Sequence, residues 1–342
     1  MKDSLHDAAA VLAGEDAWVV GGAVRDELLG RPVFDLDIAC REPERAARAL
    51  MARSGDAVFP LSTQFGAWRV VLDGSRTVDF SPLQGGSIER DLAVRDFSVN
   101  AMAVPLAGGD LLDPFGGRPD LESRILRPVS ERVFDDDPVR LFRAVRLEEE
   151  LGFRLDPAAE GLVRAKAGLA DRPAGERILD ELTRLSADGF ERLAELGLVE
   201  PLGGRADPRL RAFDSAWFRL AVAFGGNLKR LPISNDLRRF VDTLLRAEAP
   251  ADDSPRAIYR FRRTTEPWAL EALAFVGAPE LADAVEQARK EEPAEPLLRG
   301  DELGIPPGRE VGRLLELIAE ERAAGTISTR AEAEELVRRS LE

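Results

Sequence analysis

Residues 19–40, VVGGAVRDELLGRPVFDLDIAC, combine an apolar strand, a glycine pair, a helix and a second strand in one short run. On the second strand Asp35 and Asp37 are separated by a single residue, so their side chains project from the same face. Two neighbouring carboxylates repel each other unless a cation lies between them, and Mg²⁺ prefers oxygen ligands of this kind. The run therefore predicts a Mg²⁺ site held by Asp35 and Asp37.

The glycine pair ahead of these carboxylates predicts a place where a phosphate can approach the backbone. Gly21 and Gly22 end the first strand, and the following helix directs free N–H groups toward the same place. Arg25, one turn into that helix, adds a guanidinium that suits bidentate contacts with phosphate. A glycine pair alone is more often a plain tight turn, but the nearby Asp35 and Asp37 favour a phosphate site.

A third carboxylate, Asp79, lies in the strand-like segment RTVDFSPL at residues 76–83. If this strand neighbours the one that carries Asp35 and Asp37, three carboxylates converge. Such a set can hold one or two Mg²⁺ ions and activate a hydroxyl for in-line attack on phosphorus. The alternative is that Asp79 only solvates an edge strand.

The segment VRDFSVNAMAV, residues 94–104, carries a polar trio. Asp96 and Asn100 are four apart, which predicts one face of a helix, and Arg95 lies beside them. These three side chains suit the hydroxyls of a ribose and a phosphate.

The segment DDDPVRLFRAVRL, residues 135–147, predicts a helix that starts at Pro138, because proline is favoured in a first turn. Asp137 is followed by three arginines at intervals of three, and such a row winds around a helix surface. The arginines are Arg140, Arg143 and Arg146. The alternative is a string of ion pairs on a solvated helix.

The charge balance of the chain limits how it can bind nucleic acid. The 342 residues are 44% hydrophobic and carry a net charge of −15, which argues against coating a polyanion through bulk electrostatics. All but four of the 47 basic residues are arginines, which favour directed contacts with phosphates or bases. The segment PRAIYRFRRTTEP predicts RNA contacts at Arg260, Arg262 and Arg263, with a solvated helix face as the alternative.

Scarce residue types exclude several classes of protein. The single cysteine, Cys40, cannot form an internal disulfide, and the single histidine, His6, leaves no zinc cluster and disfavours an imidazole-based hydrolase. No apolar run approaches the roughly 20 residues that a membrane span needs, and the N-terminus lacks a signal-peptide pattern. The sequence therefore predicts a cytoplasmic protein without a membrane partner.

The spacing of strands and helices changes along the chain. Residues 1–128 alternate short strands and helices, and the short links between strands favour a mixed sheet over a parallel one. Helical periodicity then dominates to the end, with interruptions rich in proline and glycine. The prediction is an α+β fold, with an α/β domain at 1–128 and helical segments at 129–190, 191–292 and 293–342.

Together these motifs resemble, in order and spacing, the class II (bacterial-type) tRNA nucleotidyltransferases and poly(A) polymerases of the DNA polymerase β-like superfamily. The motifs are GGAVRDELLG with DLD, VRDFSVNA, DPFGGRPDL and DDDPVRLFRAVRLEEELGF, within residues 19–153. RPAGERILDELTRL resembles the RNA-binding neck of the family, and the segment that begins LLRGDELG resembles its tail. The resemblance implies a catalytic head at 1–128, a neck at 129–190, a body at 191–292 and a tail at 293–342.

The resemblance also implies an activity. The enzyme would add C and A to the 3′ end of tRNA, from CTP and ATP, by Mg²⁺-dependent attack of the 3′-OH on the α-phosphate. Asp35 and Asp37 would bind the catalytic Mg²⁺, and Asp79 is the third candidate catalytic residue. The implied nucleotide contacts are Gly22 and Arg25 at the incoming nucleotide, Arg95, Asp96 and Asn100 at the ribose, Asp137 and Arg140 as a protein template for the base, and Arg143 and Arg146 beside them.

A protein template has a physical basis. Cytosine and adenine both present an amino donor next to a ring-nitrogen acceptor, whereas uracil and guanine present the reverse order. A carboxylate that accepts from the amino group and a guanidinium that donates to the ring nitrogen, such as Asp137 and Arg140, therefore fit both bases. Each such pair discriminates by about 1–3 kcal/mol, by analogy with bidentate contacts to DNA bases.

The sequence departs from the family pattern in places. About 15 residues separate Asp79 from Arg95, where many members carry a longer flexible loop associated with the switch from C to A addition. Asp136 and Val94 stand where the family usually has glutamate and arginine. CC-only addition, A-only addition and poly(A) synthesis are the alternatives within this chemistry; a DxD glycosyltransferase and a catalytically silent RNA-binding protein lie outside it. No DNA partner is predicted, and the oligomeric state stays open.

Overall fold

The structure is a computed structural model of the chain. It describes residues 2–55, 57–62, 66–72 and 76–342, with side chains from residue 7 onward. These residues form two compact units, each described by itself below. The first unit is Met1–Glu181 with Arg192–Pro201, and the second unit is Leu182–Glu191 with Leu202–Glu342.

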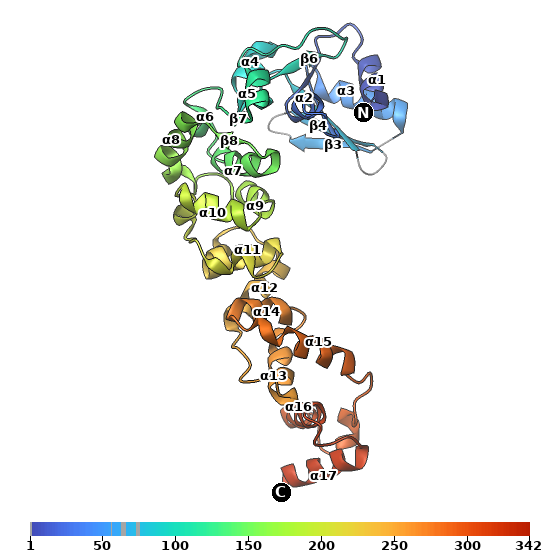
Figure 1. Cartoon of the computed structure of the whole chain (residues 1–342). Helices are drawn as coiled ribbons and strands as arrows, with labels where there is room; N and C mark the ends of the chain where they lie inside the picture. Colours follow the sequence, from blue (N-terminus) through green and yellow to red (C-terminus); the bar gives the residue numbers. More distant parts are fainter. Residues whose placement is uncertain (1, 56, 63–65, 73–75) are drawn as a thin grey trace. The chain divides into compact units, whose positions relative to one another are not determined.

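The first unit contains a six-stranded mixed sheet, in the order β3-β4-β5-β2-β1-β6. Its edge strands β3 and β6 are labelled in Figure 1. β2 and β5 pair in parallel, and the other described neighbours pair antiparallel. The predicted α+β fold with a mixed sheet is therefore confirmed. The strands are β1 (Trp18–Val20), β2 (Asp35–Cys40), β3 (Ala57–Ser62), β4 (Ala67–Leu72), β5 (Arg76–Pro82) and β6 (Ala103–Pro105).

Most other elements of the described chain are helices. The first unit contains α1 (Lys2–Val11), α2 (Gly22–Leu28), α3 (Pro43–Ser54), α4 (Ile88–Ala93), α5 (Gly117–Ser123), α6 (Val133–Asp136), α7 (Arg140–Leu151) and α8 (Pro157–Lys166), and the short strands β7 (Ile125–Leu126) and β8 (Arg154–Leu155). The boundary between the units falls within α9 (Gly175–Thr183) and α10 (Ala187–Glu195). The second unit contains α11 (Ala216–Phe224), α12 (Asn235–Arg246), α13 (Pro255–Thr265), α14 (Ala269–Val276), α15 (Ala282–Glu291), α16 (Arg309–Ala323) and α17 (Arg330–Leu341). In the part of the chain described here, no helix has both the length and the apolar character to cross a membrane.

Alternation over residues 35–38 of β2 and 77–80 of β5 separates apolar side chains on one face of the sheet from polar ones on the other. The apolar side chains are Leu36, Ile38, Val78 and Phe80, which are at most 4% exposed. Burying each side chain of this kind contributes about 1.5–3 kcal/mol, which fixes the register of the two strands. Asp35, Asp37 and Asp79 consequently lie together on the opposite face.

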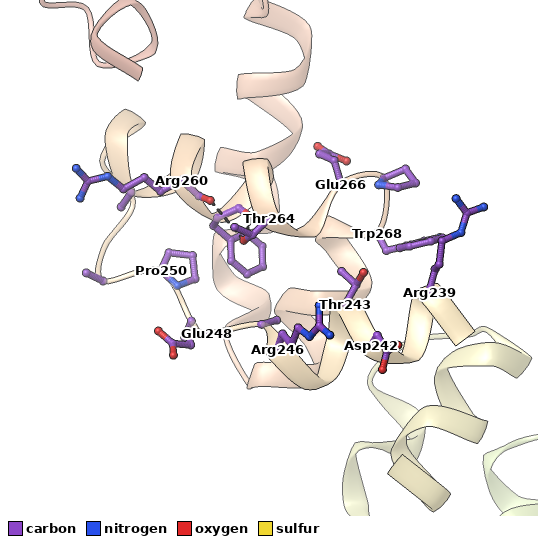
Figure 2. A pocket seen from close by; sticks show the side chains of 16 residues that line it. Arg239, Asp242, Thr243, Arg246, Glu248, Pro250, Arg260, Thr264, Glu266 and Trp268 are labelled. Carbon is purple, nitrogen blue, oxygen red and sulfur yellow. Dashed lines mark hydrogen bonds between the residues drawn. The ribbon is translucent and has the colours of Figure 1, made fainter. Parts of the chain in front are cut away.

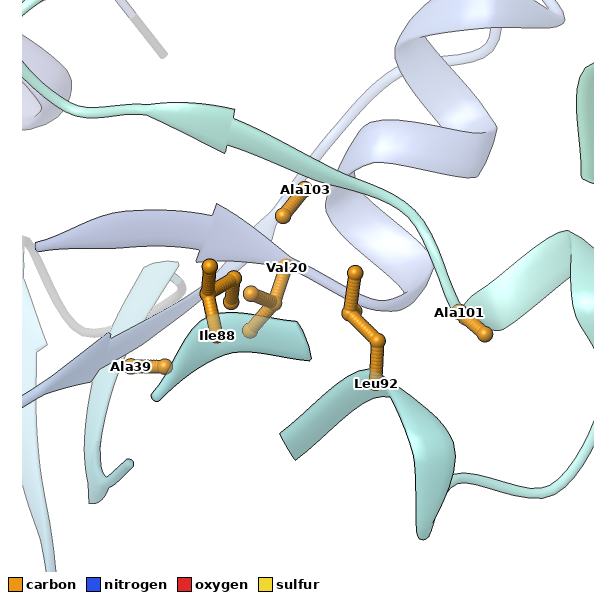
Figure 3. Close-up of a cluster of buried hydrophobic side chains, with 6 residues drawn as sticks. All are labelled: Val20, Ala39, Ile88, Leu92, Ala101 and Ala103. Carbon is orange, nitrogen blue, oxygen red and sulfur yellow. The ribbon is translucent and has the colours of Figure 1, made fainter. Parts of the chain in front are cut away.

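A second apolar cluster holds α4 against β1 and β2. Figure 3 shows its six buried side chains: Val20, Ala39, Ile88, Leu92, Ala101 and Ala103. Ile88 and Leu92 are four apart on α4, so one face of this helix is buried in the cluster. The packing places the last turn of α4, and Arg95 just after it, beside the ends of the strands.

Gly117, in the segment DPFGGRPDL, has no room for a side chain. An ideal Cβ here would lie 2.3 Å from the carbonyl oxygen of Ser98 and 2.8 Å from Cγ of Met102. We expect Gly117→Ala to lower the free energy of unfolding by about 1–3 kcal/mol, because overpacking forces the backbone to shift. Gly161→Ala in α8 is the control: its Cβ meets nothing within 4 Å, and alanine favours a helix by about 1 kcal/mol. Urea unfolding measures both, and equal stability of the two variants would contradict the steric account.

Candidate active site

The carboxylates of Asp35, Asp37 and Asp79 come from neighbouring strands. Across the parallel pair β2–β5, Asp37 is opposite Asp79 and Asp35 is opposite Thr77. Burial, together with repulsion from Asp79 and Asp35, raises the pKa of Asp37 to about 6, although the guanidinium of Arg95 opposes this effect. The half-buried carboxylate of Asp37 therefore lacks positive charge, which a divalent cation would supply.

Arg69 of β4 already holds the third carboxylate. Its Nε and Nη2 donate to the two oxygens of Asp79 at 2.7 and 2.6 Å. Thr77 Oγ1 donates to Asp35 Oδ1 at 2.7 Å, and within the described residues no three His, Cys, Asp or Glu side chains form a group that could hold a metal ion. Asp35 and Asp37 are thus the candidate ligands for Mg²⁺, whereas the carboxylate of Asp79 already has a counter-charge in Arg69.

The turn between β1 and α2 comes close to Asp37. Gly21 has φ 70° and ψ −137°, a conformation that favours glycine. A Cβ at this position would lie 2.9 Å from Nη1 of Arg95 and 3.4 Å from Oδ2 of Asp37. Gly22, by contrast, is the first residue of α2. The tight approach of the backbone therefore falls on Gly21 of the predicted glycine pair, one residue before Gly22, which the family resemblance places at the incoming nucleotide.

The segment with Asp96 and Asn100 is not the helix that its spacing predicted. Phe97 is extended and forms a β-bridge with Pro128, and residues 98–100 make a single 3₁₀ turn. The prediction fails because the fully buried Phe97 is anchored by this distant partner, which outweighs local helix preference. The two polar side chains still meet, since Nδ2 of Asn100 donates to Oδ1 of Asp96 at 3.0 Å.

Asp137 precedes α7 instead of lying on it. Its backbone is extended, at φ −149° and ψ 94°, and α7 begins at Arg140 and not at the predicted Pro138. Nε of Arg140 lies 3.9 Å from Oδ2 of Asp137, is buried and has no hydrogen-bond partner. Nη2 of Arg140 donates to the carbonyl of Val94 at 2.6 Å, while both oxygens of Asp137 accept from Arg177.

A closed ring of polar side chains joins α2 and residues 96–100 to α7 and α9. We call it the polar ring; it runs from Arg25 through Asn100, Asp96, Arg143, Glu181 and Arg146 to Glu150 and back to Arg25. Glu181 is 4% exposed and accepts from Arg143 at 3.0 Å and from Arg146 at 2.6 Å. Burial alone would raise the pKa of Asp96, but Arg143 and the hydrogen bond from Asn100 outweigh it and lower that pKa.

A hollow of about 700 Å³ opens between these segments. Pockets for small ligands commonly measure about 300–1,000 Å³, so a nucleotide fits this space. The predicted residues that line it are Gly22, Arg25, Asp37, Arg95, Asp96, Asn100, Arg140, Arg143 and Arg146. Asp35, Asp79 and Asp137 are not part of its lining.

Four charged residues that contact the predicted site residues were not predicted from the sequence: Arg69, Asp91, Arg177 and Glu181. Asp91 is 3% exposed and accepts two hydrogen bonds from Arg95, four residues later, at 2.9 and 3.0 Å. Arg177 and Glu181 are also four apart and opposite in charge, a spacing that the sequence displays. Arg69 could have been found by counting back across the β4–β5 hairpin from Asp79.

A larger hollow, of about 920 Å³, lies in the second unit (Figure 2). Its lining balances three arginines against three acids: Arg239, Arg246 and Arg260 against Asp242, Glu248 and Glu266. This balance gives no preference for a polyanion.

The three arginines predicted to contact RNA belong to α13 in the second unit, and each is paired with a glutamate. Arg260 pairs with Glu320 at 2.6 Å, Arg262 with Glu292 at 2.6 Å, and Arg263 with Glu316 at 2.7 Å. A phosphate would have to displace a carboxylate at each position, so we expect these arginines to contribute less to RNA binding than unpaired ones would.

The amino-acid sequence of the chain is similar to those of known proteins. Residues 17–127 match the family described as the poly A polymerase head domain. The chain is 34% identical to a CC-adding tRNA nucleotidyltransferase of Geobacter sulfurreducens, in an alignment that covers 97% of this chain and 93% of that protein. It is 45% identical to an A-adding tRNA nucleotidyltransferase of Deinococcus radiodurans, in an alignment that covers 54% of this chain and 44% of that protein.

Solved structures share the fold. The Thermotoga maritima CCA-adding enzyme complexed with tRNA superposes with a TM-score of 0.77, at 24% identity, over 99% of this chain and 94% of the other. At this level of identity the likeness concerns the arrangement of the backbone.

Proposed function

Because the chain belongs to the tRNA nucleotidyltransferase family, and is an enzyme of that family, we propose that it adds C and A to the 3′ end of tRNA. The substrates are CTP, ATP and a tRNA that lacks all or part of its terminal CCA. The observation that carries this proposal is the position of Asp37. The pKa of its carboxyl group is raised, and a second carboxylate, Asp35, lies on the same strand. Asp37 also lines a hollow that is large enough for a nucleotide.

We propose Mg²⁺ as the cofactor, with Asp35 and Asp37 as its ligands. The donor set fits, because two carboxylates on one face provide hard oxygen ligands and burial leaves Asp37 short of positive charge. When bound, Mg²⁺ neutralises these carboxylates and supplies charge stabilisation to the phosphoryl oxygens. Asp79 supports the site through its negative charge and stays paired with Arg69.

The remaining residues position the reactants. Arg25 and Arg95 line the hollow while paired with Asp26 and Asp91, and the N–H donors that these pairs leave over suit a triphosphate. Asp96 and Asn100 present groups that suit the hydroxyls of a ribose. The 3′-OH of the tRNA attacks the α-phosphorus and releases its proton to water, a new P–O bond forms, and pyrophosphate leaves with the electrons of the broken P–O bond.

Base selection is assigned to Asp137 and Arg140. Nε of Arg140 is buried without a partner and is available to a ring nitrogen, while Asp137 accepts from the amino group of C or A. Neither U nor G offers this donor and acceptor order, so both are rejected. Arg143 and Arg146 hold the shape of this surface through Glu181.

CC-only addition is the second candidate, and the chain between β5 and Arg95 favours it. The 3₁₀ turn Gln84–Gly86 and α4 fill this connection, and α4 is fixed by the apolar cluster of Figure 3. The family resemblance associates the switch from C to A addition with a longer flexible loop at this place. A short, packed connection is what an enzyme without that switch needs.

Extension of defined tRNA transcripts separates these candidates. Transcripts that end before CCA, after the first C and after the second C are incubated with Mg²⁺, CTP and ATP, and the products are sequenced. Addition of CCA supports the proposed function, and products that end in CC despite ample ATP identify the second candidate. Long A tails would identify a poly(A) polymerase, and no extension of any transcript would overturn the proposal.

A further inference from the structure

Helix α9 presents two opposite charges to the segment around α7. Arg177 and Glu181 are four apart, so they lie on the same face of α9. Glu181 contacts Arg143 and Arg146, and Arg177 contacts Asp137. The helix therefore holds the acidic residue of the row that begins at Asp137 and two of its three arginines, Arg143 and Arg146.

The guanidinium of Arg177 makes a bidentate contact with the carboxylate of Asp137. Nη1 of Arg177 donates to Oδ1 of Asp137 at 3.0 Å, and Nη2 donates to Oδ2 at 2.7 Å. The other cation near this carboxylate, Arg140, stays 3.9 Å away. Because Asp137 lies on an extended residue between two helices, no helical neighbour fixes its side chain, and the fork from Arg177 does so.

A carboxylate bound in this way keeps acceptor capacity. Its two oxygens offer about four lone-pair sites, and a bidentate fork uses one on each oxygen. One site on each oxygen remains for another donor, so Asp137 can be held by Arg177 and accept from a base at the same time. The fork therefore defines the direction from which a base must approach.

We propose that Arg177 is a positioning residue for base selection, which orients the carboxylate of Asp137 toward the amino group of C or A. This inference rests on the proposed function, because it needs Asp137 to read the base. Without the fork the carboxylate rotates, and it then also accepts from the ring N–H of uracil. Loss of Arg177 consequently weakens the rejection of U more than it slows the addition of C.

A role limited to holding the fold is distinguishable from this one. The side chain of Arg177 is 51% exposed and that of Asp137 is 23% exposed, and ion pairs of this kind contribute little to stability. Arg177→Ala is therefore expected to fold with an unchanged melting temperature. Arg177→Lys keeps the charge but loses the planar fork, so its base selectivity is expected to lie between that of the alanine variant and that of the unchanged chain.

The experiment measures kcat and KM for CTP and for UTP with a tRNA transcript that ends before CCA. For Arg177→Ala we expect the ratio of kcat/KM for CTP over UTP to fall about tenfold, the scale of one bidentate contact to a base. Arg172→Ala is the matched control, because it removes an exposed arginine five residues earlier without touching Asp137, and it should keep the ratio unchanged.

The outcomes separate the inference from the function on which it rests. If the unchanged chain incorporates no nucleotide, the proposed function fails. If it prefers CTP and Arg177→Ala keeps the same preference, the positioning role is wrong. A lower KM for CTP in Arg177→Ala with full preference would show that Arg177 competes with the base, which also overturns the inference.

Discussion

Replacing Asp37 by asparagine is expected to abolish the incorporation of every nucleotide, by a factor of about 10³ or more. The substitution keeps the shape of the side chain and removes the negative charge that would bind Mg²⁺. Charge stabilisation by a bound metal is worth several kcal/mol, and each 1.36 kcal/mol is tenfold in rate, which gives this magnitude. The loss should be equal for CTP and ATP, because the metal site does not read the base. Single-turnover extension of a labelled tRNA transcript measures it.

A matched control excludes a loss of folding. Asp16→Asn removes a carboxylate from the same unit, where Asp16 pairs with Arg41 on the surface, and activity should not change. The melting temperature of Asp37→Asn should not fall, because burial and like charges already oppose ionisation of this carboxyl. A folded Asp37→Asn variant that retained activity within tenfold would show that Asp37 is not a metal ligand.

Replacing Glu181 by alanine is expected to lower the free energy of unfolding of the first unit by about 3–5 kcal/mol, the cost of breaking a buried ion pair from one side. Glu181 is 4% exposed and holds the guanidiniums of both Arg143 and Arg146. Removal of the Glu181 carboxylate leaves the guanidiniums of Arg143 and Arg146 without the partner that they share in the polar ring. Urea unfolding followed by circular dichroism measures the change.

Glu195→Ala is the control for this second prediction. Glu195 ends α10, in the part of this helix that belongs to the first unit, and pairs with Arg192, but its side chain is 62% exposed. We expect a change of about 0.5 kcal/mol or less, as for other exposed pairs. Equal effects of the two substitutions would show that the buried bridge at Glu181 does not stabilise the unit.

Much of the fold and part of the candidate site could be predicted from short stretches of sequence. Alternation along FDLDIAC and RTVDFSPL places carboxylates on one face and Leu36, Ile38 and Phe80 on the other. The order of the motifs indicated the family, and the short links between strands indicated a mixed sheet. These properties are local, because they depend on the period of a strand and on the lengths of turns.

Local rules failed where a distant contact competes with them. Asp96 and Asn100 have helical spacing, yet the bridge from Phe97 to Pro128 keeps this segment extended. Asp137 was expected at the start of a helix that begins only at Arg140. In the first segment Asn100 still donates to Asp96, and in the second Asp137 takes Arg177 of α9 as its partner.

The sequence by itself determined the family, the mixed sheet, and the shared face of Asp35 and Asp37, because each follows from periodicity and order along the chain. Only the tertiary structure decided the partners of the charged groups. Arg69 on Asp79, Arg177 on Asp137, and Glu181 between Arg143 and Arg146 join residues 10 to 40 positions apart. The physical reason is that a charge in a chain rich in both signs has many possible partners. Packing of the apolar faces brings one of them within hydrogen-bond distance, and at the buried Glu181 it also excludes the water that would otherwise replace the partner.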